Sequence, residues 1–201
     1  MAEPQRTIKP RLLIASGNPG KLTEYRELLA GYGLELDGME TGVVEHADSY
    51  AANATLKAEA ACAAAGLPAV GDDSGLEVAG LDGFPGVRSA RLGVTQEARH
   101  ERLFARLAGV PRPWRARFVC TLALAIPGRP TRVFTGSREG EVVEPRAGST
   151  GFGYDPIFLV PEVGKTFAEM TPTQKHLWSH RGAAVRAMVE SGALGEITAN
   201  A

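Results

Sequence analysis

A short apolar run, a glycine-bearing polar turn and a helical pattern follow one another at the start of the chain, and this succession most constrains the fold. Residues 12–15 are apolar, and Ser16-Gly17-Asn18-Pro19-Gly20-Lys21 follows them directly. Leucine and tyrosine then recur at helical spacing as far as Gly33, a residue type that commonly ends helices. A buried strand, a tight turn and a helix in this order are typical of α/β folds, so we expect that class.

Two further helices have recognisable starts. Ser49 precedes an alanine-rich segment that runs to about residue 65, and Gly66 follows it. Such small side chains allow a helix to pack close to a sheet. Thr95 precedes a second helical pattern, and a last helix is expected near the C-terminus, with a break at Gly182 left open.

Strand patterns occupy the middle of the chain. Residues 115–126 alternate between two kinds of side chain, which predicts a half-buried strand. A short strand is expected to end at residue 70, directly before Asp72 and Asp73. Further strands are expected at residues 76–78, 131–136, 141–144 and 157–160, and residues 37–48 are expected to form a loop.

Charge and cysteine usage argue against several classes of protein. The 201 residues carry a formal net charge of -1, whereas general nucleic-acid binders usually present a basic face. The two cysteines, Cys62 and Cys120, form no CxxC pair, so we expect neither a zinc site nor an oxidising compartment. No apolar run is long enough to span a membrane. We therefore expect a soluble cytoplasmic protein, with a loose leader over residues 1–10 and a single domain over residues 11–201.

The turn after the first strand is the first candidate site. Ser16, Asn18 and Lys21 stand at a helix start, where outward N–H groups and the helix dipole favour an anion. Lys21 adds a positive charge. Because the spacing of a Walker A loop is absent, a polar turn with a surface lysine stays open as the alternative to a phosphate site.

The second candidate site is Gly71-Asp72-Asp73-Ser74-Gly75. Carboxylates directly after an apolar strand lie where α/β sheets usually bind ligands. Adjacent residues of an extended chain point to opposite sides, so the two carboxylates need not face one site. Carboxylate oxygens favour Mg²⁺ or Mn²⁺, whereas an Asx-type turn is the competing interpretation.

A third candidate is the segment Gly151-Phe152-Gly153-Tyr154-Asp155-Pro156. An aromatic ring between glycines can stack on a flat base, and Asp155 could accept a hydrogen bond from a base N–H. A tight turn with buried aromatic side chains is the alternative.

The fourth candidate combines Lys175 with Ser179-His180-Arg181-Gly182. These donors suit a carbonyl, carboxylate or phosphate partner, and a solvated basic helix end is the alternative. The remaining histidines show no ligand spacing and are expected at the surface or in caps; they are His46, His100 and His176.

No one of these segments is decisive, but their order and content together are specific. The chain resembles the inosine triphosphatase (Ham1-like) family of noncanonical purine nucleoside triphosphate pyrophosphatases. The resemblance spans residues 12 to about 190. Besides the four segments above, it rests on Asn53-Ala54 with Lys57-Ala58 and on Pro85-Gly86 with Ser89-Ala90-Arg91.

The resemblance implies a fold and an activity. The expected fold is an elongated two-lobed α/β structure around a mixed central β-sheet flanked by helices, with a nucleotide cleft between the lobes. The expected reaction is Mg²⁺-dependent hydrolysis of inosine, deoxyinosine and xanthosine triphosphates to the monophosphate and pyrophosphate, by a homodimer.

Site roles also follow from the resemblance. Asp73 is expected to be the proton acceptor and a metal ligand, with Ser74 touching substrate. The second metal ligand is expected to be Glu45, with Glu40 as the alternative. The triphosphate is expected to contact Ser16, Gly17, Asn18, Pro19, Gly20 and Lys21, and the base Phe152, Gly153, Tyr154, Asp155, Lys175, His180 and Arg181.

The chain departs from the family pattern at Ala52, where many relatives carry a glutamate. Two other functions stay open. One is a pyrophosphatase for other modified nucleotides, and the other is a nucleotide-binding regulator without catalysis, which the paired aspartates argue against.

Overall fold

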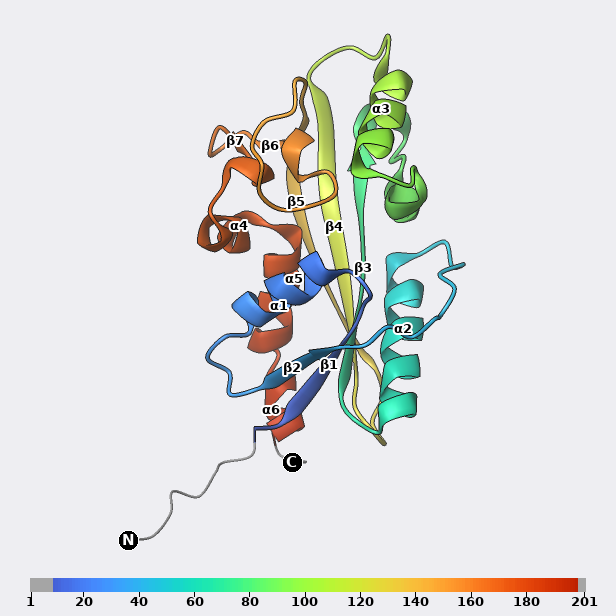
Figure 1. The fold of residues 1–201 in the computed structure, drawn as a ribbon, viewed down its shortest axis with the longest axis vertical. Coiled ribbons are helices and arrows are strands. Elements are labelled where there is room, and N and C mark those ends of the chain that lie inside the picture. Colours follow the sequence, from blue (N-terminus) through green and yellow to red (C-terminus); the bar gives the residue numbers. More distant parts are fainter. Residues whose placement is uncertain (1–8, 199–201) are drawn as a thin grey trace, which may run out of the picture.

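One mixed β-sheet runs along the molecule and organises its other elements (Figure 1). The computed structural model describes residues 9–198. The seven strands lie in the order β2-β1-β3-β4-β5-β6-β7; β1 pairs in parallel with β2 and β3, and the other pairs are antiparallel. The strands are β1 (Arg11–Ala15), β2 (Glu35–Gly38), β3 (Ala69–Val78), β4 (Trp114–Ala125), β5 (Arg132–Val142), β6 (Phe158–Val160) and β7 (Lys165–Thr166).

Helices cover both faces of this sheet. Figure 1 shows α2 and α3 on one side and α1, α5 and α6 on the other. The α-helices are α1 (Pro19–Leu28), α2 (Tyr50–Ala65), α3 (Gln96–Leu107), α4 (Pro172–Trp178), α5 (His180–Glu190) and α6 (Ala193–Thr198). Short 3-10 helices are η1 (Ala79–Leu81), η2 (Gly86–Arg91), η3 (Asp155–Ile157) and η4 (Phe167–Glu169).

The two largest of the four hydrophobic cores in the described residues give the molecule its two lobes. The first lies where α1, α5 and α6 pack on the sheet, and the second lies among α3, β6 and the ends of β3 and β4. Strand β4 serves both cores, because Leu122 and Leu124 belong to the first whereas Ala116 and Phe118 belong to the second. The predicted two-lobed α/β fold around a mixed sheet is therefore confirmed.

Helix α2 approaches the sheet closely because the facing residues of the helix and of the sheet have small side chains or none. A Cβ atom on Gly71 would lie 2.0 Å from the carbonyl oxygen of Ala54 and 2.7 Å from the nitrogen of Ala58. Only glycine leaves room for this approach, which brings the N-terminal half of α2 against β3. The prediction of close packing by the alanine-rich helix is confirmed.

Helix starts were well predicted. The side chain of Ser49 accepts a hydrogen bond from Ala52 N and begins α2, and Thr95 does the same for α3 with Ala98 N. Gly66 ends α2 in the left-handed conformation. The open question at the last helix is resolved at Ser179, whose side chain accepts from Gly182 N, so the break precedes Gly182.

Several strand predictions were wrong in extent. The separate strands expected at residues 131–136 and 141–144 are parts of one strand, β5, which runs from Arg132 to Val142, and residues 37–48 include the end of β2. The inner half of β4 is buried on both faces, because α2 and α5 cover its two sides. The first helix ends at Leu28 and not at Gly33.

The acidic pair lies inside a strand and does not follow one. Strand β3 continues from Ala69 through Asp72 and Asp73 to Val78 and pairs with β4 along that whole length. Antiparallel pairing supplies the hydrogen bonds that a turn would otherwise have to make locally. Both the strand end at residue 70 and the Asx-turn interpretation are therefore wrong.

The expected leader falls mostly outside the described residues, since residues 1–8 are not among them. Within residues 9–198, Pro10 O accepts a hydrogen bond from Glu35 N at the start of the sheet. No helix in that part of the chain combines the length and apolar character needed to cross a membrane.

Candidate active site

A cleft with a cavity volume of about 350 Å³ lies where the two cores meet along β3 and β4. This size is in the usual range for small-molecule sites. Among the predicted site residues, its lining includes Ser16, Gly17, Asn18, Lys21, Glu45, Asp73, Ser74, Phe152, Gly153, Tyr154, Asp155, Lys175, His180 and Arg181. Pro19 and Gly20 lie in the same turn but outside the lining.

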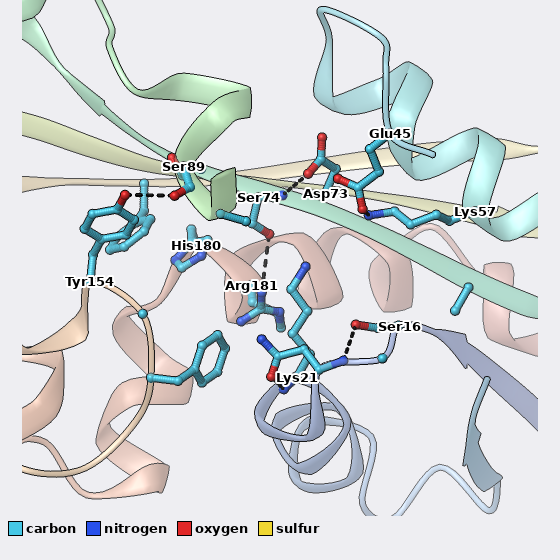
Figure 2. Close-up of a pocket in the computed structure, with 18 of the residues that line it drawn as sticks. Ser16, Lys21, Glu45, Lys57, Asp73, Ser74, Ser89, Tyr154, His180 and Arg181 are labelled. Atoms are coloured by element: carbon cyan, nitrogen blue, oxygen red, sulfur yellow. Dashed lines mark hydrogen bonds and ion pairs between the residues drawn. The ribbon is translucent and has the colours of Figure 1, made fainter. Parts of the chain in front are cut away.

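The cleft has two chemically different ends (Figure 2). Glu45, Lys57 and Asp73 lie together at one end, called here the acidic end. Ser89, Tyr154 and His180 lie together at the other, called here the aromatic end, and Phe152 lines the cleft two positions before Tyr154. Ser16 approaches from the turn before α1, and Lys21 from the first turn of α1.

The turn before α1 is internally bonded. The side chain of Asn18 accepts hydrogen bonds from Gly20 N at 2.9 Å and from Lys21 N at 3.4 Å, and Asn18 N donates to Ser16 Oγ at 3.2 Å. The expectation that these N–H groups point outward is therefore wrong, because Asn18 caps the helix. Positive charge remains at the cleft through Lys21, which is part-buried and lines it.

Asp72 and Asp73 project to opposite sides of the strand, as the pleat requires. Asp72 is fully buried and accepts hydrogen bonds from Lys21 Nζ (2.8 Å), Tyr25 Oη (2.7 Å) and Arg181 Nε (2.7 Å). Burial raises its pKa, but the charges of Arg181 and Lys21 outweigh burial and hold that pKa well below its usual range. Asp72 is therefore an ionised structural anchor.

Asp73 faces the acidic end, where its charge is less fully balanced by nearby cations than that of Asp72. Its carboxylate accepts from Asn53 Nδ2 at 2.9 Å and from Ser74 N at 3.0 Å. Burial raises the pKa of Asp73, partly opposed by the Asn53 hydrogen bond and the charge of Lys57. A carboxylate with a raised pKa and access to a cleft is suited to accept a proton.

Glu45 is the acidic-loop residue that reaches this end. Its carboxylate accepts from Lys57 Nζ at 2.6 Å, and its charge raises the pKa of Asp73, so the two carboxylates are neighbours. Glu40 also lines the cleft. Within residues 9–198, no group of three or more His, Cys, Asp or Glu side chains is arranged to hold a metal ion. Ala52, the position at which the chain departs from the expected family pattern, is outside the lining.

The aromatic end is shaped by a glycine turn closed by Asp155. Asp155 Oδ2 accepts from Phe152 N at 2.7 Å and from Lys175 Nζ at 2.6 Å. A Cβ atom on Gly151, which has φ of +76°, would lie 2.1 Å from Asp155 Oδ2. The known partners of Asp155 are thus within the protein, and its contact with a base stays a prediction.

A network of buried ion pairs holds the side chains of the aromatic end in place. Lys175 pairs with Glu24 and Asp155 at 2.6 Å each, and Arg181 pairs with Glu24 and Asp72. Burial raises the pKa of Glu24, but the charges of Arg181 and Lys175 outweigh burial and lower that pKa to about 2. The alternative interpretation of this segment as a solvated basic helix end is wrong, because Lys175 and Arg181 are both buried.

His180 is a buried polar group at this end with unused hydrogen-bonding capacity. Its ring stacks on Phe118, with centroids 4.5 Å apart and planes 8° from parallel. Its buried Nδ1 atom has no partner among the described residues. Burial, reinforced by the charge of Arg181, lowers the pKa of His180 well below its usual range, so the ring is neutral.

Sequence reasoning missed several residues that build the site. Glu24 and Tyr25 lie three and four positions after Lys21 on α1, a spacing that places them on one helix face and could have drawn attention to them. His100 was expected at the surface or in a cap but is buried within α3, with Nε2 donating to Gly153 O at 2.8 Å. Its partner lies 53 positions away, so no local pattern identifies it.

Comparisons with known proteins agree with this architecture. A dITP/XTP pyrophosphatase of Gloeobacter violaceus is 46% identical over 186 residues, which cover 92% of this chain and 95% of that protein. A dITP/XTP pyrophosphatase of Thermus thermophilus is 45% identical over 188 residues, covering 90% and 91%.

Solved structures give the same result. The structure of the Staphylococcus aureus Ham1 protein superposes with a TM-score of 0.79 at 36% identity, covering 92% of this chain and 99% of that one. A dITP/XTP pyrophosphatase structure from Mycobacterium abscessus gives a TM-score of 0.68 at 37% identity, covering 89% and 97%. The sequence model of the Ham1 family matches residues 12–191, and the chain belongs to the Ham1 family.

Proposed function

We propose that this protein hydrolyses noncanonical purine nucleoside triphosphates, namely those of inosine, deoxyinosine and xanthosine, to the monophosphate and pyrophosphate. The observation that carries the proposal is that residues from distant parts of the chain line one cleft. They are Ser16, Gly17, Asn18 and Lys21, the ion pair of Glu45 and Lys57, Asp73 with Ser74, Ser89 with Ala90, residues 152–155, and Lys175 with His180 and Arg181. The 46% identical relative named dITP/XTP pyrophosphatase supports the same substrate class.

The acidic end has the donor set for a divalent cation shared with substrate. Asp73 and Glu45 supply carboxylate oxygens, and Mg²⁺ is commonly bound by one or two carboxylates together with substrate phosphates. When bound there, Mg²⁺ (or Mn²⁺) would offset phosphate charge and polarise the α-phosphorus. Two protein carboxylates, and no larger acidic cluster among residues 9–198, fit this mode of binding.

The protein groups then divide the reaction between them. Asp73 accepts a proton from the water that attacks the α-phosphorus. Lys21 and Lys57, both at the cleft, offset the charge of the phosphates and of the departing pyrophosphate. Attack at the α-phosphorus releases pyrophosphate, whereas attack at the γ-phosphorus would release orthophosphate.

Selection of the base depends on hydrogen bonding at the aromatic end. The base stacks on Phe152, and neutral His180 donates to the 6-oxo group of hypoxanthine or xanthine. Adenine presents a 6-amino donor at that position, and an unpaired buried donor costs roughly 1–3 kcal/mol. Arg181 contributes less to this selection than expected, because three of its nitrogens already donate to Asp72, Glu24 and Ser74.

One assay tests the proposal. Pyrophosphate release is measured from inosine, xanthosine, adenosine and guanosine triphosphates, with and without Mg²⁺. We expect rapid release from the first two and dependence on the cation. Equal rates on the ordinary triphosphates would favour a pyrophosphatase for other modified nucleotides, and binding without release would favour a regulator.

Assembly and location also belong to this proposal. A homodimer and a cytoplasmic location are expected, with nucleotide as the substrate and with no nucleic-acid or membrane partner. Sedimentation velocity on the full chain tests the assembly, with a mass of twice 21.2 kDa expected.

A further inference from the structure

Arg99, in the first turns of α3, lines the cleft although the reaction above does not use it. Its guanidinium is anchored at one point, where Nε donates to Gly93 O at 2.8 Å. The side chain is half-buried. Arg99 is therefore held at the cleft wall with its terminal nitrogens uncommitted to any described residue.

The neighbouring residue places Arg99 at the aromatic end. His100 donates to Gly153 O at 2.8 Å, and its ring centroid lies 5.6 Å from that of Tyr154. Tyr154 in turn donates to Ser89 O at 2.8 Å. These contacts fix α3 against the turn that carries Phe152, and the charge of Arg99 acts on the Tyr154 hydroxyl.

Arg99 differs from the other cations of the cleft in its charge balance. Each of the others has a carboxylate partner, which is Asp72 for Lys21, Glu45 for Lys57, Asp155 and Glu24 for Lys175, and Asp72 and Glu24 for Arg181. Arg99 has no carboxylate within ion-pair distance among residues 9–198. Among residues 9–198, it is thus the cleft cation whose charge no protein carboxylate balances.

The purine bases differ at position 2 in a way that such a donor can read. Xanthine carries a 2-oxo acceptor, hypoxanthine carries only hydrogen, and guanine carries a 2-amino donor. A base whose 6-oxo group faces His180 presents position 2 on the same ring, two atoms further along its edge. Arginine donors pair well with an oxo group, whereas two facing donors leave both unpaired.

We propose that Arg99 reads position 2 of the base, favouring xanthine through its 2-oxo group and rejecting guanine through its 2-amino group. The inference rests on the proposed function, because it assumes a purine at the aromatic end. It accounts for discrimination against guanine, which shares the 6-oxo group that His180 reads.

The test compares kcat/KM for the triphosphates of xanthosine, inosine and guanosine in Arg99→Met and in a matched control. Arg102→Met is the control, because Arg102 lies on the same helix and donates to the adjacent Leu92 O at 2.6 Å but is outside the cleft lining. For R99M we expect kcat/KM on xanthosine triphosphate to fall roughly tenfold or more, which is the effect of leaving one acceptor unpaired. The kcat/KM on inosine triphosphate should change by less than about threefold, and that on guanosine triphosphate should rise.

Other outcomes separate this inference from the function on which it rests. An equal fall in kcat/KM on all three substrates would show that Arg99 only supports the turn, and it would overturn the proposal. Unchanged ratios of kcat/KM between the substrates would overturn it too. If the unaltered enzyme releases pyrophosphate from none of them, the proposed function itself fails. Arg99→Lys, which keeps the charge but not the planar fork, should retain part of the xanthosine preference, and it replaces R99M if that variant does not fold.

Discussion

The two ends of the cleft are held in different ways. At the aromatic end, Glu24, Asp72 and Arg181 form a buried ion network whose partners come from α1, β3 and α5. At the acidic end, Glu45 lies on a segment, residues 40–48, that makes no backbone–backbone hydrogen bond with any described residue.

Side chains alone tie residues 40–48 to the rest of the molecule. Asn53 exchanges two hydrogen bonds with Ala47 at 3.1 Å each, Lys57 holds the carboxylate of Glu45, and Arg91 donates to Glu45 O at 3.0 Å. Segments with few backbone bonds and little buried surface open at low free-energy cost. The aromatic end is thus held by buried ion pairs, whereas the acidic end includes a segment that can move at a lower free-energy cost.

The largest expected effect comes from removing the proton acceptor at the acidic end. Asp73→Asn should reduce pyrophosphate release by roughly 10²–10⁴-fold, the usual contribution of a general base, while nucleotide still binds. Because burial raises the pKa of Asp73, its ionised form is disfavoured in the folded state, so the variant should melt no lower than the parent.

Turnover and calorimetric binding of the inosine nucleotide measure the two effects separately. Near-normal turnover in the Asp73→Asn variant would remove Asp73 from its role. If Asp72→Asn loses as much turnover as Asp73→Asn and also melts at a lower temperature, the loss in Asp72→Asn comes from disruption of the buried ion network.

Breaking the network at the aromatic end should affect stability more than chemistry. Glu24→Gln leaves Arg181 and Lys175 each short of one carboxylate, and removing a partner from a buried pair costs about 3–5 kcal/mol. Glu27→Gln is the matched control, because Glu27 is exposed on the same helix and pairs with His176, a contact worth about 0–1 kcal/mol. Chemical denaturation measures both.

The sign of the pH dependence gives a second readout for Glu24. Its folded pKa of about 2 lies below the ordinary value of 4.5, so its contribution is present above pH 4.5 and is lost as pH falls toward 2. Acid denaturation of the Glu24→Gln variant should therefore be shallower over this window. Equal acid profiles in parent and variant would contradict the assigned ion pairs.

The smallest effect is expected from removing the hydrogen bond that Arg91 donates to Glu45 O at the acidic end. Arg91→Ala removes one exposed hydrogen bond to Glu45 O, so KM for substrate should rise roughly two- to tenfold with little change in melting temperature. Arg88→Ala is the control, since Arg88 approaches only the exposed Asp48, at 4.0 Å. A loss of turnover as large as that of the Asp73 variant would show that the acidic end is as rigidly built as the aromatic end.

Much of the fold and of the site inventory was accessible from the sequence. Caps such as Ser49 and Thr95 are local signals, so the starts of α2 and α3 were predicted, and Gly66 also gave the end of α2. The six ordered segments also indicated the family, because residue types along the chain are retained whatever their spatial arrangement. The pleat of an extended chain alone separated Asp72 from Asp73.

Only the tertiary structure decided what each of those residues experiences. Asp72 and Asp73 are adjacent in sequence, yet one is held ionised by Arg181, 109 positions away, and the other has its pKa raised by burial. Glu24 meets Arg181 across 157 positions. Charge compensation acts through space over a few ångströms, so the ionic character of a carboxylate is set by neighbours that the fold brings to it and not by those beside it in the chain.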